Sequence, residues 1–149
     1  MPQSLASAYL HLVFSTKERR PFLRDPGLRG NAFEFIAGAS KKLDCPVLRV
    51  GGIEDHVHIL ARLGRTISIA DWVKEVKRVS SQWIQKNGAQ GFQWQSGYGV
   101  FSVSQSNVDE VTTYVERQED HHRKMTFQDE LRALLRRHHL NFDEQYLWD

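Results

Sequence analysis

The sequence predicts an α+β protein with a ferredoxin-like split βαβ sheet, two helices on one face of that sheet, and an added C-terminal helix that carries a tyrosine. The predicted elements follow the order β-α-β-β-α-β through residue 104. No repeat, low-complexity segment or interdomain linker interrupts the chain. A chain of 149 residues can bury one hydrophobic core, so we expect a single domain over residues 1–149.

Short apolar runs bounded by turn residues predict the strands, and apolar residues at three- and four-residue spacing predict the helices. Gly51 and Gly52 predict a bulge or bend near the end of the second strand. The predicted strands cover residues 5–16, 46–53, 53–63 and 98–104, and the predicted helices cover residues 27–43, 68–86, 107–124 and 127–138.

Two of these helices carry more detailed expectations. In helix 68–86, the spacing predicts a core face formed by Trp72, Val76, Val79 and Trp83. Helix 107–124 is expected to start with a capping box, in which Asn107 is the N-cap and Glu110 follows three residues later. This helix lies outside the βαββαβ order and is the added helix of the predicted fold.

Composition excludes several classes of protein. Hydrophobic residues make up 40% of the chain and charged residues 26%, as in an ordinary globular domain. No apolar run approaches the roughly 18 residues of a membrane span, and the N-terminus lacks the pattern of a secretory signal. The single cysteine, Cys45, precludes an internal disulfide and is expected to be a small buried residue. We therefore expect a cytoplasmic protein without a membrane partner.

The net charge of +2 says little about nucleic acid, but the distribution of basic residues is informative. Basic side chains gather after the first strand and again along helix 68–86, close in sequence to a pair of histidines. Lys and Arg contacts to phosphates supply much of the affinity for nucleic acids. The candidate DNA-binding residues are Lys17, Arg19, Arg20, Lys74, Lys77 and Arg78.

Two histidines separated by one residue form the first chemical motif. Alternate residues of a strand point to the same face, so His56 and His58 share a face and Val57 points the other way. Two imidazoles side by side on a strand are well placed to bind one metal ion. The alternative is a strand that carries two histidines without a metal.

The second motif lies on helix 107–124. Tyr114 and Gln118 are four residues apart and therefore lie on one helical face. A tyrosine hydroxyl can act as a covalent nucleophile, and an amide oxygen one turn away can complete the coordination of a metal. The alternative is that Tyr114 packs in the core with Val111 and Val115 while Gln118 is solvated.

Two further histidine pairs are adjacent in sequence. Neighbouring residues on a helix point about 100° apart, so a pair of this kind does not chelate one ion well. We therefore expect His121, His122, His138 and His139 to make surface or polar contacts.

Together the two motifs resemble the single-tyrosine HUH transposases, small enzymes that move insertion sequences as single-stranded DNA. The two histidines with a hydrophobic residue between them match His56-Val57-His58, the nucleophile of that family matches Tyr114, and its helix-borne third ligand matches Gln118. The resemblance keeps its order over nearly the whole chain, in residues 9–17, 94–102 and 118–122, followed by Phe127, Glu130 and Leu131.

The resemblance implies a specific reaction. Tyr114 would attack a phosphodiester of single-stranded DNA, leave a 5′-phosphotyrosine link and a free 3′-hydroxyl, and the strands would then be rejoined without ATP. His56, His58 and Gln118 would hold Mg²⁺ or Mn²⁺. The substrate would carry a DNA hairpin near the end of a mobile element. The resemblance also implies a homodimer in which the tyrosine helix of one subunit completes the histidine site of the other.

Other interpretations remain open at this stage. A domesticated relative would keep the same chemistry for host repeats, and only the genomic flanks of the gene would distinguish it. A nucleic-acid-binding module without catalysis would use aromatic residues exposed on the sheet, and no such signature is evident. A zinc hydrolase would require a third His, Asp or Glu ligand at helical spacing, which is also not evident.

Overall fold

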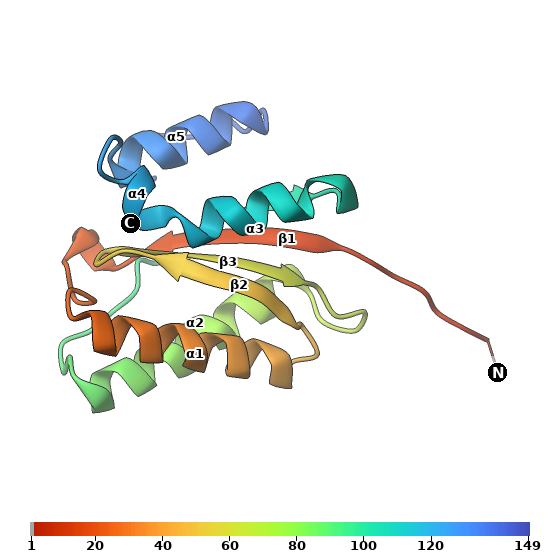
Figure 1. Cartoon of the computed structure of the whole chain (residues 1–149), viewed down its shortest axis with the longest axis horizontal. Coiled ribbons are helices and arrows are strands. Elements are labelled where there is room, and N and C mark those ends of the chain that lie inside the picture. The colour runs from red at the N-terminus through yellow and green to blue at the C-terminus, as the bar shows by residue number, and fades with distance from the viewer. Residues whose placement is uncertain (1) are drawn as a thin grey trace.

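The computed structural model describes residues 2–149 and contains a four-stranded sheet with helices on both faces (Figure 1). The strands lie in the order β2-β3-β1-β4, and each neighbouring pair is antiparallel. This is the arrangement of a split βαβ sheet, so the predicted fold class is confirmed. The strands are β1 (Tyr9–Ser15), β2 (Val47–Gly52), β3 (His56–Arg62) and β4 (Gly99–Val103).

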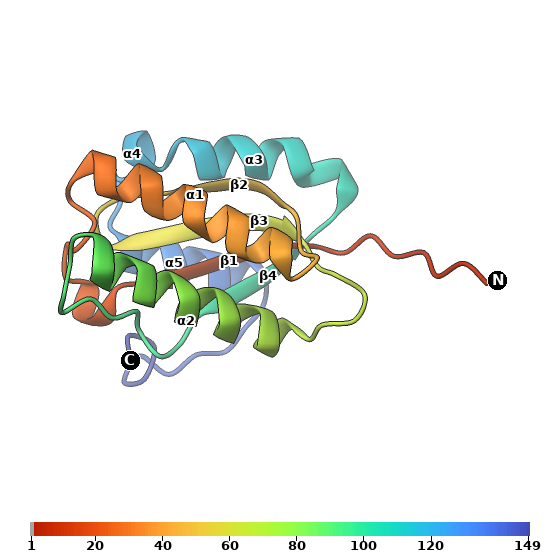
Figure 2. The same cartoon turned by 90° about the horizontal axis from the view of Figure 1, so that it is seen from below.

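Helices cover the two faces of the sheet unequally. The long helices α1 (Pro26–Lys42) and α2 (Ile69–Asn87) lie together on one face, as predicted (Figure 2). The opposite face carries α3 (Val108–Glu116), α4 (Gln118–His121) and α5 (Phe127–Arg137) (Figure 1). Two short 3₁₀ turns, η1 (Lys17–Arg19) and η2 (Gln105–Asn107), follow β1 and β4.

The predicted helix 107–124 is two helices rather than one. Its backbone leaves the helical conformation at Arg117 (φ −98°, ψ 28°), where α3 ends and α4 begins. Asn107 is the residue that precedes α3, as predicted, but the capping box is wrong. Asn107 has φ −104° and ψ 0° at the end of η2, and its side chain makes no capping hydrogen bond. Side-chain caps are instead made by Asp25, Ser68 and Thr126 at the starts of α1, α2 and α5.

The main core lies between the sheet and the pair α1 and α2. Leu12, Phe14, Val57 and Ile59 point into it from the central strands. On α2 the core face is rotated from the predicted one: Trp72 and Val76 are buried as expected, but Val79 and Trp83 are only half-buried, and the buried positions are completed by Val73, Ser80 and Ile84.

A hydroxyl at Ser80 is tolerated in this core because it has a partner. The indole Nε1 of Trp94 donates a hydrogen bond to Ser80 Oγ at 3.0 Å. Similarly, the indole Nε1 of Trp72 donates to Ser40 Oγ at 2.9 Å. Buried polar groups are costly unless they are paired, and these two pairs satisfy that requirement.

The opposite face of the sheet has two smaller apolar contacts. Helix α3 packs through Val108 and Val115 against Leu60 of β3. Helix α5 packs against Val13 of β1 and Phe101 of the edge strand β4, through Phe127, Leu131, Leu134 and Leu135. The region between these two contacts is polar and contains the predicted site.

Gly51 and Gly52 have different structural roles. Of the predicted bulge or bend, the ladder shows no bulge at either glycine, and the bend falls at Gly52. A Cβ atom on Gly51 would lie 2.0 Å from the carbonyl oxygen of Val115, so the glycine permits α3 to approach β2 closely. Gly52 has φ +154° at the turn into β3, and a Cβ atom there would lie 2.2 Å from the carbonyl oxygen of His56. The irregularity in the ladder lies between Val47 and Arg49.

Two expectations from the composition, on Cys45 and on membrane-spanning helices, can be compared with the structure. Cys45 is buried, and its sulfur accepts a hydrogen bond from the backbone N–H of Gly64 at 3.2 Å. Within residues 2–149, none of the helices combines the length and the apolar character that crossing a membrane requires.

Candidate active site

The two histidines of β3 lie on the sheet face covered by α3, α4 and α5. Val57 between them points into the main core, so the alternation inferred from the sequence is confirmed. The side chains of His56 and His58 are both fully buried. Strand pairing on both sides of β3 holds these two side chains in a fixed register.

Each histidine is oriented by a hydrogen bond at its Nδ1 atom. His56 Nδ1 lies 2.9 Å from Asp55 Oδ1, and His58 Nδ1 lies 2.8 Å from His11 Nε2. Both Nε2 atoms therefore point away from these partners and toward the space below α4 and α5. Hydrogen bonds of this kind commonly fix the ring orientation of metal-binding histidines.

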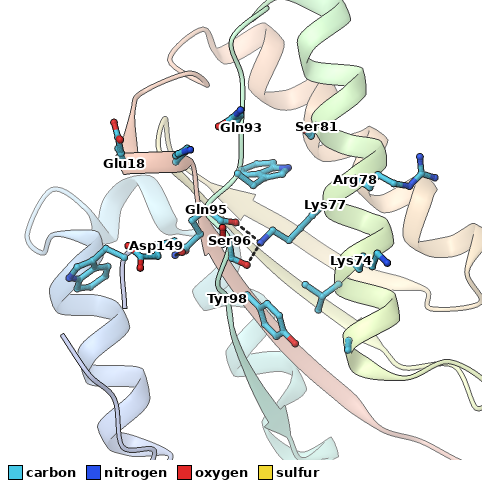
Figure 3. A pocket seen from close by; sticks show the side chains of 15 residues that line it. Glu18, Lys74, Lys77, Arg78, Ser81, Gln93, Gln95, Ser96, Tyr98 and Asp149 are labelled. Carbon is cyan, nitrogen blue, oxygen red and sulfur yellow. Dashed lines mark hydrogen bonds between the residues drawn. The ribbon is translucent and has the colours of Figure 1, made fainter. Parts of the chain in front are cut away.

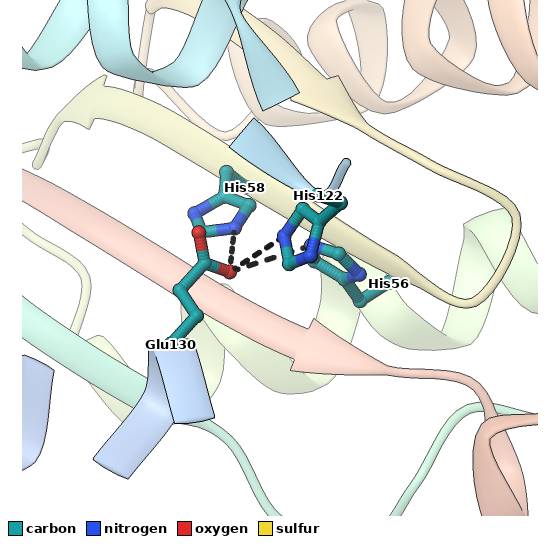
Figure 4. A group of neighbouring side chains, drawn as sticks. All are labelled: His56, His58, His122 and Glu130. Carbon is teal, nitrogen blue, oxygen red and sulfur yellow. Dashed lines mark hydrogen bonds and ion pairs between the residues drawn. The ribbon is translucent and has the colours of Figure 1, made fainter. Parts of the chain in front are cut away.

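Glu130 on α5 and His122, which directly follows α4, also bring donor atoms into this space (Figure 4). Glu130 Oε1 lies 2.9 Å from His58 Nε2 and 3.5 Å from His56 Nε2. His122 Nε2 lies 3.2 Å from the same Glu130 oxygen. The donor atoms of these four residues all lie within 4.8 Å of one another.

Gln118 also faces this group. Its amide nitrogen donates to the carbonyl oxygen of Tyr114 at 3.3 Å, which turns the amide oxygen inward. Gln118 Oε1 lies 3.2 Å from His56 Nε2 and 3.0 Å from His122 Nε2. The side chain is almost fully buried, so it is not the solvated residue of the alternative interpretation.

The spacing and chemistry of these donors fit a divalent metal ion. Ligands about 2.0–2.1 Å from one ion lie about 3–3.5 Å apart, which agrees with the distances above. His122 donates through Nδ1 to the carbonyl oxygen of Met125 at 2.8 Å, so in its neutral form the lone pair of Nε2 faces the oxygens of Gln118 and Glu130. Such a convergence of lone pairs requires protons or a cation between them.

The electrostatics of the metal-free protein agree with this description. Burial lowers the pKa of His56, but hydrogen bonds to Asp55 and Glu130 outweigh burial and raise that pKa to about 9. Burial lowers the pKa of His58 to about 4 despite the nearby carboxylate. Burial raises the pKa of Glu130, but His58, His122 and His56 outweigh it and hold that pKa well below its usual range. The buried carboxylate of Glu130 thus lies beside two imidazoles, His56 and His58, whose pKa values are shifted in opposite directions.

Tyr114 lies beside this group in the same chain. Its ring centroid is 5.7 Å from that of His58, and its hydroxyl donates a hydrogen bond to Glu130 Oε2. His121 Nε2 lies 3.5 Å from the same hydroxyl. Burial, followed by the charge of Glu130, raises the pKa of Tyr114 well above its usual range. Tyr114 is thus half-buried with its hydroxyl in the polar site, and it is not part of the apolar cluster of Val111 and Val115.

Two surface hollows meet at Tyr114. One, of about 820 Å³, is lined by Tyr114, His121, the basic residues Arg117, Arg123 and Lys124, and the acidic residues Glu110 and Asp120. The other, of about 390 Å³, is lined by Tyr114, His11 and Arg137 among others. A polyanionic strand could reach the tyrosine through the first hollow. Sequence reasoning missed these basic residues because it searched near the histidine strand.

The predicted DNA-binding residues lie in another part of the molecule. Lys17, Lys74, Lys77 and Arg78 line a hollow of about 770 Å³ between α2 and residues 93–98, with the exposed ring of Tyr98 at its edge (Figure 3). Arg19 is exposed at the end of the neighbouring η1 turn, and Arg20, exposed directly after it, pairs with Glu18.

Lys77 differs from its neighbours in this hollow because its amine is already engaged. It donates to the carbonyl oxygens of Gln95, Ser96 and Gly97 at 2.6, 3.2 and 3.1 Å. Burial lowers its pKa to about 8. The structure therefore gives Lys77 a role in holding residues 95–97 in place.

Sequence reasoning missed four residues of the site. His122 was expected to make surface or polar contacts, yet its side chain is 5% exposed and it joins the donor group. One signal was available, because His122 is four residues after Gln118 and shares its helical face. For Asp55, the signal in the sequence was its position directly before His56. His11 and Glu130 lie in segments that resemble the transposase family, but their local sequence predicts no place in the site. Their positions depend on strand pairing and on the docking of α5.

Comparison with solved structures supports the fold described above. A candidate transposase from Deinococcus radiodurans R1 is 22% identical, with a TM-score of 0.62, and the match covers 79% of this chain and 98% of that one. A REP-associated tyrosine transposase bound to a REP hairpin is 11% identical, with a TM-score of 0.55, and the match covers 78% and 70% of the two chains. At these identities the likeness establishes the fold, which is that of tyrosine transposases.

The family itself is identified from the sequence. The profile of the IS200-like transposases matches residues 4–118, so the chain belongs to that family. None of the curated proteins compared with the chain matches it significantly. His122 and Glu130 lie beyond the last residue that the family profile matches.

Proposed function

We propose that this protein is a metal-dependent transposase that cleaves and rejoins single-stranded DNA, with Tyr114 as the nucleophile. The observation that carries the proposal is the shared carboxylate of Glu130, which accepts a hydrogen bond from the Tyr114 hydroxyl and contacts His58 and His122. A nucleophile and a group of metal donors thus lie together beside a hollow that carries three basic side chains. Membership of the IS200-like transposase family supports the same activity.

The proposed step is a transesterification at phosphorus. The Tyr114 oxygen forms a bond to the phosphorus and loses its proton, while the bond to the 3′-oxygen breaks and that oxygen leaves as a 3′-hydroxyl. The 5′-phosphate remains attached to the tyrosine. Attack by a 3′-hydroxyl reverses the step and rejoins a strand, so no ATP is consumed. A free tyrosine is ionised only to about one part in a thousand at pH 7, so the protein must assist the attack.

The cofactor is proposed to be a divalent metal ion held by His56, His58 and Gln118, with His122 and Glu130 as further donors. Such an ion would act as a Lewis acid on the phosphate and orient it. The sequence pointed to Mg²⁺ or Mn²⁺. The additional imidazole of His122 argues against Mg²⁺, which prefers oxygen ligands and retains several waters. Of the two ions Mn²⁺ is the better fit, and three imidazoles would also suit a later transition ion such as Zn²⁺.

The proposed substrate is single-stranded DNA with a hairpin near the end of a mobile element. The likeness to a transposase solved with a REP hairpin supports this substrate. Arg117, Arg123 and Lys124 would guide the scissile strand toward Tyr114, and the hollow lined by Lys17 and Lys74 would contact another part of the DNA. A domesticated relative acting on host repeats would use the same site, and terminal hairpins in the genomic flanks would distinguish the two.

We propose that the tyrosine acts in cis, in place of the trans arrangement that the resemblance implied. The support is the close packing of α3 on its own sheet at Gly51 and the contact between Tyr114 and Glu130 within one chain. A homodimer stays a prediction, because each subunit could carry a complete site.

A covalent adduct assay tests the proposed function. The protein is incubated with Mn²⁺ and single-stranded oligonucleotides taken from the flanks of its gene, and the products are separated under denaturing conditions. We expect a protein–DNA adduct with the wild-type chain and with Tyr98→Phe, and none with Tyr114→Phe, which lacks only the hydroxyl. An adduct that persists in Tyr114→Phe would assign the chemistry to another residue.

A further inference from the structure

The two carboxylate oxygens of Glu130 face different partners. Oε1 faces the Nε2 atoms of His58 and His122 at 2.9 and 3.2 Å. Oε2 accepts the hydrogen bond from the Tyr114 hydroxyl and lies 3.2 Å from His121 Nε2. The side chain of Glu130 is 1% exposed, so each contact is made away from solvent.

The direction of this carboxylate is set by the way in which α5 packs on the sheet. Phe127, one turn before Glu130, stacks on the ring of His56 with centroids 4.4 Å apart. Leu131 and Leu134 bury their side chains against the strand residues Val13 and Phe101. Helix α5 thus presents Glu130 to the site from a fixed apolar contact, rather than from a mobile loop.

A simpler role for Glu130 is that of a counter-charge for buried histidines. That role accounts for the contacts of Oε1, because a buried charge is tolerated only when it is paired. It leaves unexplained the hydrogen bond that Oε2 accepts from the Tyr114 hydroxyl. The other neighbour of Oε2 is His121 Nε2 at 3.2 Å, and that side chain is 30% exposed, so it does not require a buried counter-charge. A counter-charge alone would leave the position of the tyrosine hydroxyl independent of the histidine group.

We propose that Glu130 is a bridging residue that ligates the metal ion through Oε1 and positions the Tyr114 hydroxyl through Oε2. The proposal rests on the function proposed above and adds a residue beyond the span of the family profile. Through this bridge, the nucleophile and the metal ion are held at one fixed separation. Glu130 is therefore both a metal ligand and a positioning residue for the tyrosine.

The ligand half of the proposal is tested by Mn²⁺ affinity in the absence of DNA, measured from the electron paramagnetic resonance signal of free Mn²⁺. We expect Glu130→Ala to weaken Mn²⁺ binding at least tenfold, and Glu130→Gln, which retains the size of the side chain, to weaken it severalfold. Asp129→Ala, on the exposed side of the same helix, is the control and should bind as the wild type does. Unchanged affinity in folded Glu130→Gln overturns the ligand role.

The positioning half is tested by NMR of protein labelled with ¹³C at tyrosine Cζ, with the Tyr114 signal assigned by its loss in Tyr114→Phe. One equivalent of Zn²⁺, a diamagnetic ion, should shift this signal in the wild type. In Glu130→Ala, saturated with Zn²⁺ bound to the histidines, the signal should stay in place. An equal shift in both proteins overturns the bridge, and so does the absence of any shift in the wild type.

Neither measurement involves DNA cleavage, so the two proposals fail separately. If the bridge holds but no oligonucleotide forms an adduct, the proposed function fails. If an adduct forms but the Tyr114 signal does not shift when Zn²⁺ binds, the bridge fails and the proposed function stands. Circular dichroism of each variant, compared with Asp129→Ala, establishes that the fold is retained.

Discussion

Tyr114 packs edge-on against His58 of its own chain, with ring planes at 79°. The contact joins α3 to β3 within one subunit and brings a hydroxyl to the edge of the histidine group. Its first consequence concerns the assembly of the protein.

Mixed subunits distinguish the cis site from a trans site. One subunit carries His56→Ala and its partner carries Tyr114→Phe, and the two are co-expressed with different tags. In cis neither subunit has a complete site, so the purified heterodimer should form no adduct. Recovery of roughly half the wild-type adduct would mean that the tyrosine reaches the histidines of its partner. Should no dimer form, activity of the wild-type monomer would support the cis site equally well.

The metal donors should differ in their importance. Replacing His56 and His58 together by alanine, or adding excess EDTA, should abolish adduct formation, because the phosphate loses its Lewis acid. Gln118→Ala should reduce activity less than His122→Ala, because water can replace a neutral oxygen ligand more readily than an imidazole held by Met125. Initial rates of adduct formation at saturating Mn²⁺ provide the comparison. Full activity in EDTA would exclude the metal role.

Single-strand binding should depend on two sets of basic residues. Each phosphate contact that is removed should flatten the slope of log affinity against log salt by about 0.7. We expect this change for Arg117→Ala, Lys124→Ala and Lys74→Ala in fluorescence anisotropy titrations. Lys77→Ala should change the slope less and stability more, because its amine is bonded to the carbonyl oxygens of residues 95–97. An unchanged slope in Lys74→Ala would make that residue ordinary surface.

The close approach of α3 to β2 should make Gly51 intolerant of a side chain. Gly51→Ala introduces a Cβ atom 2.0 Å from the carbonyl oxygen of Val115, so α3 must shift. We expect a loss of about 1–3 kcal/mol in the free energy of unfolding and a lower adduct rate. Gly38→Ala is the control, because nothing lies within 4 Å of its Cβ and alanine favours a helix. Urea unfolding of both variants measures the difference.

Acid should destabilise the metal-free protein partly through His11. Burial and the neighbouring His58 lower the pKa of His11 to about 3, whereas the unfolded chain binds this proton near pH 6.5. Between these values the unfolded state carries more protons, so stability falls as the pH falls, by up to about 1.4 kcal/mol per pH unit from this group.

His11→Gln should weaken that dependence while keeping a polar partner for His58 Nδ1. The free energy of unfolding in urea, compared at pH 7 and pH 5 for both proteins, measures the effect. If the free energy of unfolding changes by the same amount between pH 7 and pH 5 in both proteins, His11 does not take up a proton on unfolding as its buried position requires.

The sequence could predict those features that follow from the regular spacing of residues within one strand or one helix. Strand alternation was sufficient for His56 and His58, and the four-residue spacing of a helix was sufficient to group Tyr114 with Gln118. These are local geometries that a chain carries wherever it folds. Helical spacing also explains the adjacent pair His121 and His122, which point in different directions. His121 faces the tyrosine hydroxyl, whereas His122 joins the metal donors.

Longer-range features were beyond such reasoning. The break at Arg117 interrupts a pattern that reads as one helix, and it depends on how α3 and α4 meet the sheet. Glu130 looks like an exposed position on an amphipathic helix until α5 is docked against Val13 and Phe101. Its burial is a property of tertiary packing, where hydrophobic contacts outweigh the local preference of a charged residue for water.

The donors of the metal group come from residues 56–58, 118–122 and 130, so three stretches must be docked before the group exists. A growing chain still attached to the ribosome can form the sheet while α5 is unmade. At that stage it holds the strand histidines without Glu130. The group is therefore completed last, once the whole sheet and its final helix are in place, and a truncated or unfinished chain lacks it.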